Sequence, residues 1–144
     1  MENQLTILSE SLDKKLEVLQ KIREYNKRQE EIFSAEEVDM SLFDDAVEEK
    51  QRLIDEVVHL DEGFEIMYEK LAKELEGNRE RYAAQIRELQ KKVSRVTELS
   101  VTVQAQEARN KKLIENYFAK ERAGIGQRRK NAKSAYDYYK SMSG

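Results

Sequence analysis

The 144-residue sequence contains no proline, no cysteine and no tryptophan, and only five glycines. Proline and glycine interrupt helices more strongly than other residues, so their scarcity leaves long stretches free to be helical. The absence of cysteine excludes disulfide scaffolds, thiolate metal sites and a cysteine nucleophile, and it fits a reducing compartment. These absences favour a few long helices over a sheet protein.

Long uncharged runs are also missing. The longest, Leu99 to Gln106, is far shorter than the about 20 apolar residues of a transmembrane helix. The N-terminus, MENQLTILSESLDKK, has no basic stretch followed by an apolar core, so no secretory signal is visible. We therefore expect a cytoplasmic protein that does not insert into membranes.

What the sequence does contain is apolar residues at steps of three and four, the spacing of one helical face. A leucine-rich first series predicts a helix over about 4–33, a second series predicts one over about 40–76, and a third predicts one over about 78–122. The second face is broad enough that we expect it to touch two partner helices. In the third, the β-branched segment from Val93 to Val103 locally favours a strand, but a lone strand would have nothing to pair with.

The breaks between these helices carry capping signals. Ser34, Asp39 and Ser41 are each candidates to cap the start of the second helix. Gly77-Asn78 is typical of a tight helical hairpin, because glycine adopts the left-handed conformation that ends a helix. A continuous helix through Gly77 would cost only about 1 kcal/mol, so both alternatives stay open.

The predicted fold class is all-α: an elongated antiparallel bundle or coiled coil of three long helices, followed by a short basic C-terminal helix. We expect residues 1–123 to form the helical-bundle domain. Gly124 and Gly126 should end or kink the third helix, leaving residues 124–144 as a basic, tyrosine-rich tail or short helix.

Catalytic and metal-binding patterns are weak. His59 is the single histidine, and the acidic pairs are adjacent in sequence, so the two carboxylates of each pair point to different helix faces. Neither of the common phosphate-binding glycine motifs occurs. We expect no enzymatic activity, no cofactor and no metal site.

Charge is distributed unevenly. The net charge is −3, yet residues 120–144 contain seven basic and two acidic residues, a local charge of +5. Basic residues beside tyrosines can bind nucleic acid. Because the patch is small and the chain as a whole is acidic, nucleic-acid binding is not favoured.

A candidate partner-binding surface lies near the end of the third helix. The first two helices are shorter than the third, so the third should project beyond them and leave Tyr117 and Phe118 without an internal partner. With Leu113 and Ile114 they form one stripe, and exposed aromatic residues favour an interaction surface. The C-terminal Tyr136, Tyr139 and Met142 could cover that stripe when no partner is bound. Alternatively, the stripe packs on the first helix.

At the second helix the sequence resembles the FlgN family of flagellar export chaperones. The matching features are a leucine-rich first helix ending in glutamates (Glu30 and Glu31), Asp39 in a short linker, and Glu49-Lys50 followed by the aliphatic pair Leu53 and Ile54. The segment ARNKKLIENYF (108–118) is similar to the family's last helix. The basic tail departs from the features that match.

This resemblance implies a non-enzymatic cytoplasmic chaperone. It would bind C-terminal helical segments of the hook–filament junction proteins (FlgK and FlgL), prevent their premature association, and present them to the flagellar export apparatus. Two alternatives stay open. One is a FliT-like chaperone for the filament cap, and the other is a structural coiled coil that forms a homodimer through the same stripe.

Overall fold

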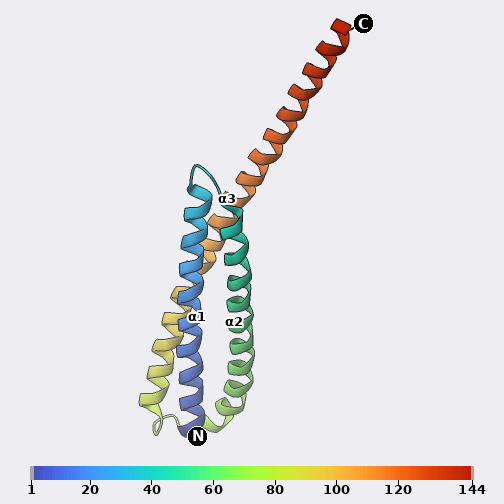
Figure 1. The fold of residues 1–144 in the computed structure, drawn as a ribbon. Coiled ribbons are helices and arrows are strands. Elements are labelled where there is room, and N and C mark those ends of the chain that lie inside the picture. The colour runs from blue at the N-terminus through green and yellow to red at the C-terminus, as the bar shows by residue number, and fades with distance from the viewer. Residues whose placement is uncertain (1, 144) are drawn as a thin grey trace.

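The computed structural model describes the backbone of residues 2–143 and the side chains of residues 2–124. It contains three helices, α1 (Glu2–Ser34), α2 (Met40–Leu75) and α3 (Ala83–Ser143), in an elongated antiparallel bundle (Figure 1). The predicted all-α fold class is confirmed. The Val93–Val103 segment is helical, so the surrounding helix overrides its local strand preference.

The α1 helix occupies the central position. It packs against both α2 and α3, whereas α2 and α3 have no close backbone contact with each other over the described residues. The broad face of α2 nevertheless reaches both neighbours through side chains, since Leu53 shares a core cluster with Val96, Leu99 and Val103 of α3 and Lys50 pairs with Glu107. Lower down, its apolar residues border a groove between α2 and α3.

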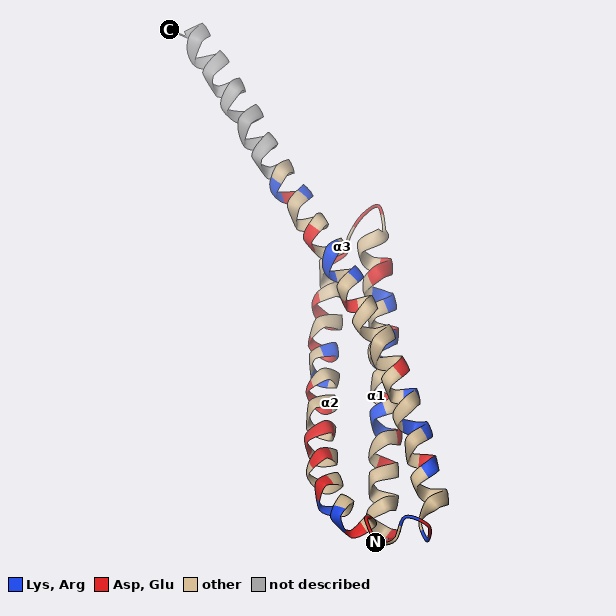
Figure 2. Cartoon of the chain, turned by 180° about the vertical axis from the view of Figure 1, so that it is seen from behind, with Lys and Arg blue, Asp and Glu red and all other residues tan. Residues whose placement is uncertain are grey.

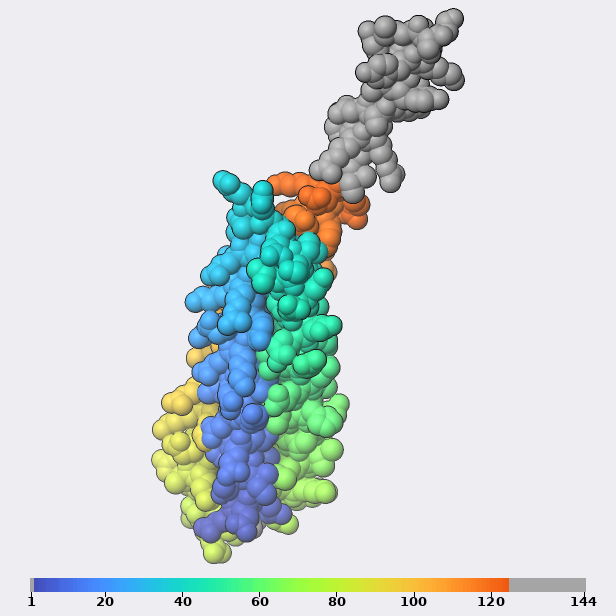
Figure 3. Space-filling view, in the orientation of Figure 1, coloured from blue at the N-terminus to red at the C-terminus, as the bar shows by residue number. Residues whose placement is uncertain are grey.

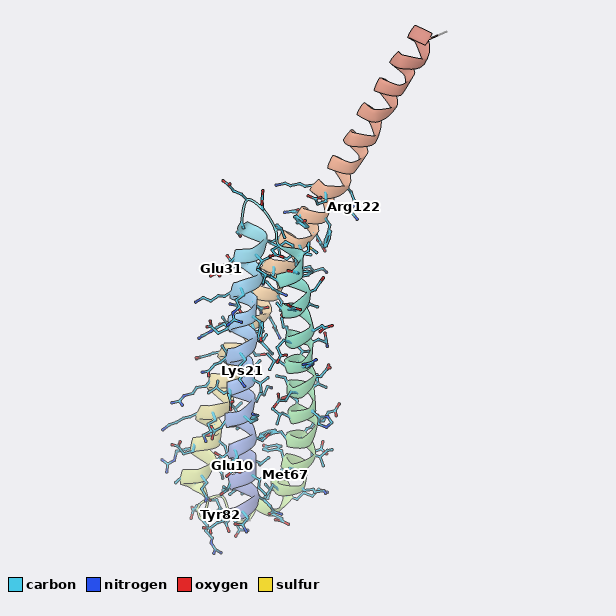
Figure 4. The ribbon with its side chains drawn as sticks, in the orientation of Figure 1. Glu10, Lys21, Glu31, Met67, Tyr82 and Arg122 are labelled. Carbon is cyan, nitrogen blue, oxygen red and sulfur yellow. The ribbon has the colours of Figure 1, made fainter. Side chains whose placement is uncertain are left out.

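The hydrophobic core consists of two clusters centred on α1. The larger one joins Leu12, Val18, Leu19 and Ile22 of α1 to Leu53 of α2 and to Val96, Leu99 and Val103 of α3. The second lies at the end of the bundle that holds the N-terminus and joins Leu5, Leu8, Leu71 and Tyr82. Figure 4 shows Met67, which packs against this cluster, and Tyr82 at that end of the molecule. We call this the lower end and the opposite one the upper end.

At the upper end, Asp39 caps the start of α2. Its backbone is extended (φ −89°, ψ 100°), and its Oδ1 accepts hydrogen bonds from the Ser41 backbone N–H (3.0 Å) and the Ser41 hydroxyl (2.7 Å). Of the three candidate caps, Asp39 is the one that the structure uses. The hydrogen bonds from Ser41, first from its hydroxyl and then from its backbone, lower the pKa of Asp39 from the ordinary value of 3.8.

Asp39→Ala is expected to lower the melting temperature at neutral pH, because it removes an N-cap. A carboxyl whose folded-state pKa is lowered stabilises the fold above its unfolded pKa, and that contribution is lost as pH falls through the folded pKa. The difference in melting temperature between wild type and Asp39→Ala should therefore shrink below about pH 4. Asp39→Asn, which keeps an accepting oxygen without the titration, is the control. A difference that stays constant from pH 7 to pH 3 would contradict this role.

The α2–α3 connection at the lower end is a true turn, which decides between the two alternatives for Gly77. Residues 76–82 form turns, and α3 begins at Ala83 rather than near residue 78. Gly77 does not adopt a positive φ. Asn78 closes α2 instead, since its backbone N–H donates to the Leu75 carbonyl (3.0 Å) and its side-chain amide donates to the Glu74 carbonyl (3.1 Å).

The third helix is longer than predicted. It does not end or break at Gly124 or Gly126 but continues to Ser143. The expected short C-terminal helix is therefore not a separate element but the last part of α3. No proline interrupts this region, and a glycine costs only about 1 kcal/mol in a helix. As expected, α3 extends beyond the upper ends of α1 and α2 (Figure 1). Among the described residues, no helix is long and apolar enough to cross a membrane.

Candidate functional site

Four aromatic rings meet at the upper end of the bundle, and we call them the aromatic cluster: Phe33, Phe43, Tyr117 and Phe118. Phe33 makes edge-to-face contacts with Phe43 (ring centroids 4.8 Å apart) and with Tyr117 (5.4 Å). Tyr117 in turn contacts Phe118 at 5.3 Å. All three helices thus contribute to one small aromatic core. Figure 3 shows the upper ends of α1, α2 and α3 together at the point where α3 leaves the body.

The cluster corrects one expectation about the predicted site. Tyr117 does have an internal partner, because Phe33 near the end of α1 is buried directly against it. Phe118 is different. Among the aromatic rings that the structure describes it contacts only Tyr117, and it is 38% exposed. Of the two predicted aromatic residues, Tyr117 therefore belongs partly to the core and Phe118 mainly to the surface.

The structure places the other predicted site residues as follows. Leu113 and Ile114 are half-buried on α3, one turn before the aromatic cluster. Ile114 lines a cavity of about 380 Å³ together with Gln29, Lys50 and Glu107. Tyr136, Tyr139 and Met142 lie outside the residues whose side chains are described. We use "end patch" for Leu113, Ile114, Tyr117 and Phe118.

Below the end patch, a polar layer connects all three helices. The ammonium of Lys50 donates to Asn26 Oδ1 (3.2 Å) and Gln29 Oε1 (3.0 Å), and it lies 2.9 and 3.0 Å from the two oxygens of Glu107. Asn110 donates from its amide to the Asn26 carbonyl oxygen at 2.8 Å. The side chain of Lys50 is only 12% exposed. These bonds fix the register of the three helices and separate the end patch from the leucine core.

Sequence reasoning missed the parts of this end that come from α1 and α2. Phe33 and Phe43 were recognisable as apolar positions, but nothing in the sequence indicates that both meet Tyr117. Lys50 and Asn110 lie in the segments that carry the family resemblance, but nothing in the sequence indicated that Lys50 pairs with Glu107 or that Asn110 bonds to Asn26. The available signal was the interruption of the apolar stripe by Asn26 and Gln29, both of which are buried.

The end patch has no features of a catalytic centre. His59 lies exposed on α2, away from the aromatic cluster. Among the side chains that the structure describes, no three histidine or carboxylate groups are arranged to hold a metal ion. Half-exposed apolar residues over a small core are instead suited to holding an apolar face of another polypeptide. The fold defines the chain as an elongated helical bundle, and the end patch is its candidate surface for a partner.

Comparison with known families makes this assignment specific. The model of the family described as FlgN protein matches residues 1–141, almost the whole chain, so the chain belongs to the FlgN family. This is a family of flagellar export chaperones and not of enzymes. A search of curated proteins and a search of solved structures each found no match.

Proposed function

We propose that this chain is a cytoplasmic chaperone whose clients are the hook–filament junction proteins of the flagellum, which are proteins like FlgK and FlgL. It binds their C-terminal helical segments at the end patch, keeps those segments from associating prematurely, and presents them to the export apparatus. The observation that carries the proposal is the 38% exposure of Phe118 beside Tyr117. A large aromatic ring held out from a packed base is the kind of residue that dominates binding energy.

The surroundings of the end patch support a helical client. Leu113, Ile114, Tyr117 and Phe118 follow the i, i+1, i+4, i+5 pattern, so they form a continuous stripe about two turns long. A client helix can lay its own apolar stripe against it, as in other helix–groove complexes. Lys111 and Lys112 are exposed next to this stripe and would attract an acidic client segment.

Phe118→Ala is expected to weaken binding of a junction-protein C-terminal segment by at least tenfold, or about 1.4 kcal/mol. Helicity and melting temperature should change little, because Phe118 is at the edge of the aromatic cluster. The measurement is isothermal titration calorimetry with the purified segment. Val101→Ala is the matched control: Val101 is 60% exposed on the same helix but lies more than four turns before Phe118.

Two results would contradict the proposal. If Phe118→Ala binds the junction segment as tightly as wild type, the client site is elsewhere. If wild type binds a filament-cap segment but not a junction segment, the client is the one expected of a FliT-like chaperone.

A further inference from the structure

A second surface at the upper end lies between α1 and α2, and no residue of α3 lines it. It is a groove of about 670 Å³ formed by α1, the α1–α2 linker and the start of α2, and we call it the upper groove. Leu42 in its lining is 55% exposed, whereas the neighbouring Phe43 packs into the aromatic cluster. The apolar lining residues come from both helices and the linker: Tyr25, Ile32, Ala35, Leu42 and Ala46.

The rim of the upper groove is acidic, with the carboxylates of Glu31, Glu37, Asp39, Asp45 and Glu49 in the lining. Two of these already have a role. Asp39 caps α2, where its charge offsets the partial positive charge of the helix N-terminus, and Glu49 pairs with Arg52 at 3.3 Å. The other three are exposed and form no ion pair within the part of the chain whose side chains are described. Figure 2 shows the acidic residues in the linker and along α2.

The basic residues near the groove lie towards its lower edge. Arg28 is in the lining, with its guanidinium carbon 5.2 Å from the centre of the Tyr25 ring. Lys21 and Arg52 flank the lower edge, and each pairs with a glutamate of its own helix, at 3.4 and 3.3 Å. Lys50 belongs to the polar layer between the three helices. None of these side chains pairs with the three free carboxylates at the top of the groove.

The net charge around the groove is therefore negative. Residues 25–49 contain nine acidic and two basic residues, a charge of −7, and adding Lys21 and Arg52 leaves −5. The end patch differs, because the exposed Lys111 and Lys112 beside it favour an acidic client. The two surfaces thus select partners of opposite charge.

The shape of the groove suits a helix. Tyr25 to Ile32 on α1 and Leu42 to Glu49 on α2 each span about 10 Å, or two helical turns. A further helix can pack into such a groove as helices do in bundles, with its apolar stripe on the floor. Glu31 near the upper end of α1 (Figure 4) and Asp45 on α2 come from opposite walls, so basic residues on both sides of that stripe would meet a carboxylate.

We propose that the upper groove binds a basic amphipathic helix of another protein. Its apolar stripe lies on Ile32 and Leu42, and its lysine or arginine residues lie against Glu31, Glu37 and Asp45. The groove is formed by α1 and α2, whereas the proposed client binds the end patch of α3, so this inference goes beyond the proposed function and does not rest on it.

Two labelled synthetic peptides test the proposal, with fluorescence anisotropy measuring their binding to the full-length chain. Both are helices about four turns long with the same leucine stripe. One carries lysine and arginine on both sides of the stripe, and the other carries glutamate at those positions. We expect the basic peptide to bind wild type at least tenfold more tightly than the acidic peptide does, because only its charge complements the rim.

Charge reversal locates the site. E31K/D45K should weaken binding of the basic peptide by at least tenfold and strengthen binding of the acidic one. E65K/E69K is the matched control, because it changes the net charge equally at exposed positions of α2 outside the lining, and it should stay within about threefold of wild type.

The apolar floor is tested without any change of charge. Leu42→Ser should weaken binding of the basic peptide by at least threefold. Val58→Ser should not, because Val58 is 51% exposed on the same helix but does not line the groove. Circular dichroism checks that every variant keeps its helicity.

Four results would each overturn the proposal. The first three are equal binding of the two peptides, wild-type binding by E31K/D45K, and wild-type binding by Leu42→Ser. The fourth is an R128E/R129E variant that binds the basic peptide at least tenfold more tightly than wild type, since the chain's own basic end would then fill the groove. Phe118→Ala should bind the basic peptide as wild type does, so failure here leaves the calorimetric test of the end patch unaffected.

Discussion

Leu71→Asp is expected to unfold the helical body, with loss of most of the helical circular dichroism signal at 25 °C. Leu71 is 1% exposed and packs with Leu5, Leu8 and Tyr82 at the lower end. The substitution removes the apolar contacts of a core leucine and buries a carboxylate with no cation beside it, which together cost more than about 4 kcal/mol. That is most of the stability of an ordinary small domain.

Ile66→Asp provides the control for this prediction. Ile66 lies five residues earlier on the same helix and is 59% exposed, so the same change of residue type should alter the melting temperature by only a few degrees. A Leu71→Asp variant that keeps its helicity and melting temperature would show that α2 does not pack on α1 through this face. Leu53→Asp, at a buried position in the larger core cluster, should behave like Leu71→Asp.

The second large effect concerns the polar layer. Lys50→Ala is expected to destabilise the body by about 2 kcal/mol, because Asn26, Gln29 and Glu107 lose a shared donor that is largely buried. The cost is lower than for a fully buried ion pair, since the side chain of Glu107 is 38% exposed. Chemical denaturation monitored by circular dichroism measures the change in the free energy of unfolding.

A double variant distinguishes loss of the ion pair from loss of packing. In Lys50→Met/Glu107→Met both charges are replaced by apolar side chains of similar length, so the part of the stability lost through the unpaired Glu107 should return, while the part lost through the Asn26 and Gln29 oxygens should not. If Lys50→Ala has no effect, or if the double variant is as unstable as the single one, the interactions of Lys50 do not hold the three helices in register.

Much of the fold could be predicted from the sequence because it follows from local chemistry. The leucine stripe ending at Phe33 placed the first helix to within two residues, and Asp39 was among the candidates to cap the second. The third helix was harder. A glycine lowers helix stability without forbidding a helix, so Gly124 and Gly126 did not reveal that α3 continues to Ser143.

Contacts between helices were harder to predict from the sequence, because they depend on how three similar apolar stripes are arranged in space. The breadth of the α2 face indicated two partner helices, and in the structure its side chains do reach α3 at Leu53 and Lys50, while lower down part of the face borders a groove between the two helices. Tyr117 was expected to lack a partner, and yet Phe33 reaches it. For the candidate site, the sequence located the stripe of the end patch. It did not distinguish the half-buried Tyr117 from the exposed Phe118, since both are aromatic residues at neighbouring positions.

Hydrogen–deuterium exchange of the full chain, with and without a C-terminal segment of a junction protein, tests the central claim most directly. The upper end is held by the small aromatic cluster, so amides around residues 110–120 should exchange quickly in the free protein. We predict that the segment slows exchange most strongly there, around Leu113 to Phe118, and leaves the leucine core unchanged. Protection confined to the lower half of the bundle, or none at all at saturating segment, would contradict the assignment of the end patch as the client site.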